Sequence, residues 1–71
     1  MITVYYSLAS SNVLKVERAP GALGYYYASA KGWVYEPLLM KKIAEGDAEE
    51  CSIDAARKIL SRNFPGVDFK L

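Results

Sequence analysis

The sequence contains no histidine and a single cysteine, Cys51, in 71 residues. One thiol cannot form an internal disulfide, so a secreted scaffold held by disulfides is excluded. Structural zinc sites are built from cysteine and histidine ligands, and these are missing as well. We therefore expect no metal and no cofactor, and a fold held by dense packing or by self-association.

Long apolar runs are also missing. No stretch approaches the roughly 18 uninterrupted apolar residues that span a bilayer, and the first residues lack the basic segment of a secretory signal. These features predict a cytoplasmic protein with no membrane partner. The length predicts a single domain, residues 1–71, whose hydrophobic core is of marginal size.

A strong charge of one sign is absent, because nine Lys and Arg residues against eight Asp and Glu residues give a net charge of +1. This balance argues against nucleic-acid binding over the whole surface. The acidic side chains are nevertheless bunched in one part of the chain, which leaves the remainder basic. The bunched residues are Glu45, Asp47, Glu49, Glu50 and Asp54.

The first half of the chain has short runs of β-branched and aromatic residues separated by turn formers. The runs that predict strands are residues 2–8, 13–18, 25–29 and 33–35. The run 9–12 predicts a hairpin turn, and Gly32 supplies a positive φ for a second hairpin. Residues 19–24 predict a loop, and its glycines are turn residues because a strand follows them, whereas a phosphate-binding loop leads into a helix.

The second half changes to a helical period. Pro37 suits the first turn of a helix that Gly46 would end. Residues 47–51 predict an acidic connector, and Ser52 is a good N-cap for a second amphipathic helix. The last segment, 67–71, alternates in polarity and predicts a short final strand or a packed tail.

Together these elements predict a small α+β domain in the order β-β-β-β-α-α-β. The sheet is expected to be mostly antiparallel, with four strands and a short fifth where the tail pairs. We expect both helices on one face of the sheet, since that is the simplest way to bury two apolar stripes. The other face would then meet solvent or a partner.

The residues for catalysis do not converge. A serine or cysteine nucleophile usually needs a base within hydrogen-bond reach, and histidine is absent. Cys51 lies near a predicted helix N-terminus, which would lower its pKa, but it follows two glutamates, which would raise its pKa. These effects oppose one another, so we interpret Cys51 as a structural thiol. The acidic cluster fits a solvated loop and the first turn of a helix better than a paired-carboxylate site. We expect a non-enzymatic protein, and a minimal enzyme using this cluster is the least favoured alternative.

Six tyrosines and one tryptophan dominate the candidate binding residues. Aromatic side chains form interface hot spots, stack on bases or extend a small core. The run 25–27 must point to both faces of a strand, so part of it belongs to the core. We predict a protein-binding module, accessory, inhibitory or homo-oligomeric, that uses the sheet face away from the helices. The residues expected there are Tyr5, Tyr25, Tyr27, Trp33 and Tyr35.

A small nucleic-acid-binding protein is the alternative. The second predicted helix is basic along its later turns, as a helix lying in the major groove would be. The connector before it is acidic and longer than the turn of a helix-turn-helix, which weakens this hypothesis. The residues expected to contact nucleic acid are Lys41, Lys42, Arg57, Lys58 and Arg62.

Overall fold

The computed structural model describes residues 2–71, which form one five-stranded antiparallel sheet and two helices. The elements in chain order are β1 (Ile2–Leu8), β2 (Asn12–Ala19), β3 (Ala22–Ser29), β4 (Gly32–Tyr35), α1 (Leu39–Ala44), β5 (Glu49–Cys51) and α2 (Ile53–Asn63). The strand order across the sheet is β4-β3-β2-β1-β5. The α+β class, the antiparallel sheet and the four-strand meander are confirmed.

Tight turns set the register of the meander. Pro20 and Gly21 alone join β2 to β3, and Gly21 has a φ of 78°, which a residue with a Cβ adopts with strain. The loop expected over residues 19–24 is therefore wrong, because β3 begins at Ala22. Gly24 lies inside β3, where a Cβ would come within 2.6 Å of the Tyr26 ring. Gly24 therefore accommodates the Tyr26 ring and does not form a turn.

The acidic segment after α1 contains a strand that its sequence pattern does not reveal. Glu49–Cys51 forms β5, which pairs with Tyr5, Tyr6 and Ser7 of β1 at the sheet edge. Residues 67–71 are the packed tail and not a strand, and the Phe69 ring centroid lies 5.2 Å from that of Trp33. The observed order is therefore β-β-β-β-α-β-α.

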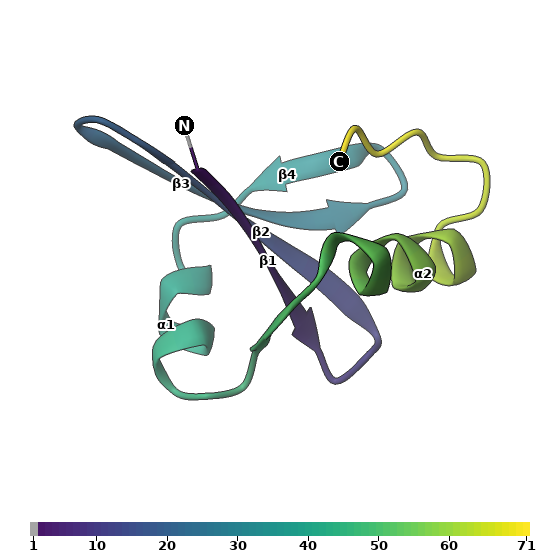
Figure 1. The fold of residues 1–71 in the computed structure, drawn as a ribbon, viewed down its shortest axis with the longest axis horizontal. Coiled ribbons are helices and arrows are strands. Elements are labelled where there is room, and N and C mark those ends of the chain that lie inside the picture. Colours follow the sequence, from purple (N-terminus) through teal and green to yellow (C-terminus); the bar gives the residue numbers. More distant parts are fainter. Residues whose placement is uncertain (1) are drawn as a thin grey trace.

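The two helices lie on opposite faces of the sheet, and the expectation that they share one face is wrong. The chain leaves the meander at β4, and α1 and the loop after it cross one face to reach β5 at the far edge. After β5, α2 returns over the other face. Figure 1 shows α1 and α2 on opposite sides of β1 and β2.

Each face has its own core. Under α2, the buried residues are Tyr5, Val13, Ala28, Ala56, Ile59 and Leu60. Under α1, they are Leu14, Leu39 and Ala48, with half-buried tyrosines around them. Val13 and Leu14 are neighbours in β2 and are 0% and 1% exposed. Because neighbouring strand residues face opposite ways, both faces of the sheet require cover.

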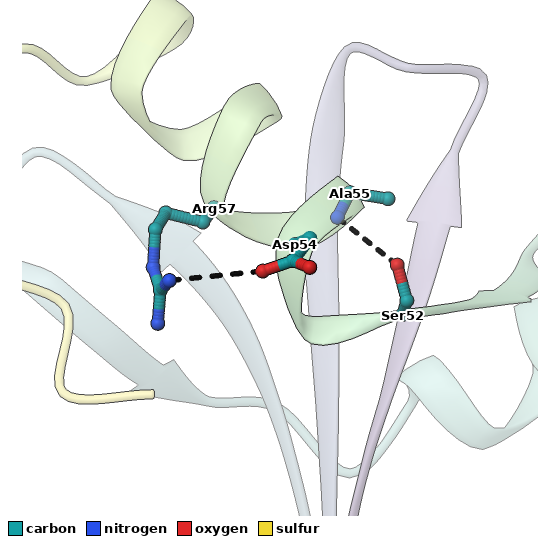
Figure 2. Close-up of polar contacts among 4 residues, drawn as sticks. All are labelled: Ser52, Asp54, Ala55 and Arg57. Carbon is teal, nitrogen blue, oxygen red and sulfur yellow. Dashed lines mark hydrogen bonds and ion pairs between the residues drawn. The ribbon is translucent and has the colours of Figure 1, made fainter.

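Both ends of α2 are fixed by hydrogen bonds. Ser52 caps the helix as expected, and its hydroxyl accepts a hydrogen bond from the Ala55 N–H at 3.1 Å (Figure 2). At the other end, Arg62 donates to the Ser10 carbonyl at 2.9 Å and Asn63 donates to the Ser11 carbonyl at 3.1 Å. These bonds hold the β1–β2 turn, where Ser10 has a positive φ of 59°.

Replacement of Leu14 tests the α1-side core. Leu14→Ala should lower the free energy of unfolding by about 3 kcal/mol, because a fully buried leucine leaves a cavity when truncated. Urea denaturation followed by circular dichroism measures this loss. The control is Leu38→Ala, whose side chain is 65% exposed and whose loss should stay within about 0.5 kcal/mol. Similar losses in the two variants would show that Leu14 does not anchor this core.

Candidate functional site

The five aromatic residues predicted as an interface are divided between the two faces. Strand register and the core contacts place Tyr5, Trp33 and Tyr35 on the α2 face and Tyr25 and Tyr27 on the α1 face. The expectation of one shared aromatic face is therefore wrong. The physical reason is that a helix crosses each face, so neither face lies wholly away from the helices.

Tyr5 belongs to the core rather than to the surface, since it is 5% exposed. Burial raises the pKa of the Tyr5 hydroxyl above its ordinary value, and the nearby Glu17 carboxylate raises it further. Trp33 is half-buried, and its Nε1 is buried without a hydrogen-bond partner among residues 2–71. Of these three aromatic side chains, only Tyr35, at 57% exposed, is largely open to solvent.

Lys15 contacts several side chains in the middle of the α2 face. Its Nζ lies 4.6 Å from the Trp33 ring centroid and 4.9 Å from that of Tyr26, and it forms an ion pair with Glu17 at 3.1 Å. Tyr26 also contacts Tyr35 edge-on, with 5.5 Å between centroids. These charges and rings already have partners within the chain, so the α2 face has no unpaired charge at its centre.

The α1 face differs, because α1 has six residues and leaves the end of the sheet nearest the β2–β3 turn uncovered. In Figure 1 this turn projects away from α1 and α2. A groove lies there between α1 and the sheet, and Tyr6, Val16, Met40 and Ile43 are among the residues that line it. We call the exposed and half-buried residues around this groove the α1-side surface: Ile2, Arg18, Leu23, Tyr25 and Met40.

The α1-side surface is apolar around one charge. Ile2, Leu23 and Met40 are 65%, 52% and 55% exposed, respectively. Arg18 pairs in register with Ile2 on one side and Leu23 on the other, so the three side chains share a row on this face. Arg18 is exposed and takes part in no ion pair among the described residues. Among residues 2–71, it is the one charged residue that lines the groove.

Of the α1-side surface, only Tyr25 was a predicted interface residue. In the sequence, Ile2 and Leu23 are typical of a strand or a loop, and Met40 is typical of a helix, so none of them indicates a binding site. The alternation of residues 2–8 indicates an apolar face but not which part of it stays uncovered. That depends on the short length of α1.

The predicted nucleic-acid contacts do not form one surface. Lys41 and Lys42 belong to α1, whereas the other three basic residues belong to α2 on the opposite side of the sheet (Figure 1). Arg57 faces Asp54 at 3.7 Å (Figure 2), and Arg62 is engaged with the turn carbonyl of Ser10. The positive charge is thus divided between two faces and is partly engaged within the chain.

The described part of the chain has no cluster of metal-ligating side chains. Residues 2–71 contain no group of three or more Cys, Asp or Glu side chains placed to hold a metal ion. Burial raises the pKa of the Cys51 thiol, and the Glu50 carboxylate raises it further. This direction reduces the thiolate fraction at neutral pH and disfavours a nucleophilic role.

Comparison of the chain with models of protein families, with curated proteins and with solved structures finds no match. Neither helix of the described residues is long and apolar enough to cross a membrane. The chain is a small α+β protein with a five-stranded antiparallel sheet and two helices packed on it.

The raised pKa of Tyr5 predicts a loss of stability in alkali. The unfolded chain releases this proton near the ordinary pKa of about 10, before the folded protein does. The stabilisation is therefore complete below that pH and is lost as the pH rises through the higher folded-state pKa. Unfolding free energies measured by urea titration from pH 8 to 11 should fall less steeply for Tyr5→Phe than for the parent protein.

The matched control for Tyr5→Phe is Tyr35→Phe, because Tyr35 is largely exposed on the same face. This variant should follow the parent profile across the same pH range. Identical slopes for all three proteins would show that Tyr5 does not contribute to the alkaline loss.

Proposed function

We propose that this chain is a non-enzymatic protein-binding module that docks a partner protein on the α1-side surface. The observation that carries the proposal is the cluster of exposed apolar side chains beside the groove, on the part of the sheet that α1 does not cover. Exposed apolar patches next to a groove are typical of interaction sites.

The energy available to a partner is substantial. Full burial of an Ile, Leu or Met side chain contributes about 1.5–3 kcal/mol. Ile2, Leu23 and Met40 each keep half or more of their surface exposed. Tyrosine and arginine are enriched at interface hot spots, and methionine adapts to irregular partner surfaces. Tyr25, Arg18 and Met40 supply all three types at one place.

Nucleic-acid binding has no comparable support. It requires several unpaired cations that follow one phosphate backbone. Here the two lysines of α1 and the three basic residues of α2 are separated by the sheet. We therefore do not advance it as a second function.

The proposal is tested by substitutions on the two sheet faces. Tagged parent protein, Leu23→Asp and Tyr35→Asp are used to recover partners from the cells that produce the protein. Retention of the partner should fall about tenfold or more for Leu23→Asp, because the variant loses an apolar contact and its carboxylate lies in register with Arg18, whose charge it would neutralise. Quantitative mass spectrometry measures the retained protein.

Tyr35→Asp is the matched control, since Tyr35 is exposed to a similar degree but lies on the opposite face. It should retain the partner at the parent level, and circular dichroism confirms that both variants remain folded. A partner lost by Tyr35→Asp and kept by Leu23→Asp would move the interface to the α2 face and overturn the proposal.

A further inference from the structure

One row of side chains on the α1 face stays exposed beyond the part that α1 covers. Side chains on this face form rows across β1, β2 and β3, and α1 packs on the row of Tyr6, Leu14 and Tyr27. The next row is Val4, Val16 and Tyr25, in which Val16 is buried and the other two are half-buried. The last row is Ile2, Arg18 and Leu23, and all three are exposed. Met40 of α1 is exposed beside this last row, and Met40 and Arg18 line the same groove. An α-helix, about 10 Å across, that lay beside α1 would cover this exposed strip and Met40 together.

The charge on this strip indicates what the occupant carries. Arg18 lies between Ile2 and Leu23 and has no ion-pair partner within residues 2–71. A partner that covers the strip removes the guanidinium from water, and this is costly unless a carboxylate pairs with it. Bidentate pairing with Asp or Glu is the strongest form of that interaction. Charge complementarity therefore calls for an acidic residue beside the partner's apolar stripe.

The same charge argues against a second copy of this chain. A symmetric dimer through the strip would bring two Arg18 side chains into one apolar interface. The residues lining the groove include no carboxylate to pair with either of them. Like charges buried together would oppose such a dimer.

We propose that the α1-side surface binds one amphipathic α-helix of a different protein, which lies beside α1 and places an Asp or Glu against Arg18. This inference rests on the proposed function and names the partner's form and charge. The helix supplies the layer that α1 is too short to provide, and it buries Ile2, Leu23 and Met40 under its apolar stripe.

Selection from random peptides tests the proposal, because it requires no identified partner. A phage-displayed library of random 16-residue peptides is selected on the full chain, and binders to the Leu23→Asp variant are removed. Enriched peptides should carry apolar residues at helical spacing with Asp or Glu beside them, and should gain helical circular dichroism on binding. Affinity is then measured by calorimetry.

Reversal of the charge at position 18 tests whether Arg18 pairs with the acidic residue of the peptide. Arg18→Glu should weaken these peptides about tenfold or more, and a peptide with Lys in place of its acidic residue should recover affinity for Arg18→Glu alone. The matched control is Arg57→Glu, an exposed arginine on the α2 face. It should change affinity by less than about twofold.

The outcomes separate this inference from the proposed function. Peptides that depend on Leu23 but lack an acidic residue, bind as extended strands or tolerate Arg18→Glu would overturn the acidic helix and leave protein binding intact. A dimer in light scattering that Leu23→Asp dissociates would show that the occupant is a second copy, which overturns the helix of a different protein. A selection with no Leu23-dependent peptide would overturn both.

Discussion

The burial of two neighbouring residues of β2 is the constraint on which the rest of this fold depends. Val13 and Leu14 are both fully buried, and they point to opposite faces of the sheet. The chain must therefore cover two faces with residues 36–71, which follow the meander. One helix crosses each face, and β5 at the far edge allows the chain to pass from one face to the other.

Elements determined by local chemistry could be predicted from the sequence. Alternation in residues 2–8 and 13–18 indicates the first hairpin, and the hydroxyl of Ser52 indicates the start of α2. β5 could not be predicted this way, because Glu49 and Glu50 do not favour a strand. They form one because the edge of β1 offers unpaired backbone groups at Tyr5–Ser7. Tertiary context overrides local preference there.

The candidate site was harder to predict than the fold, and for a different reason. The sequence indicates which residues are apolar or aromatic, but exposure depends on which part of the sheet the connections leave uncovered. Tyr5 and Tyr35 have the same chemistry, yet one is a core residue and the other is exposed. Arg18 is one of nine basic residues in the sequence. Only the register of β1, β2 and β3 places it between Ile2 and Leu23.

The short length of α1 would link binding at the proposed α1-side surface to the stability of this helix. α1 has six residues, and its N-cap, Leu38, makes no side-chain capping bond. A helix this short is not stable alone, so it depends on the contacts of Leu39 and Ile43 with the sheet. A helix docked beside it would bury Met40 and add contacts to this short helix. Because a ligand that binds only the folded state stabilises that state, occupancy of the groove by the proposed partner would increase the order of α1. Arg18 would make this stabilisation selective, since an occupant without a carboxylate would bury an unpaired charge.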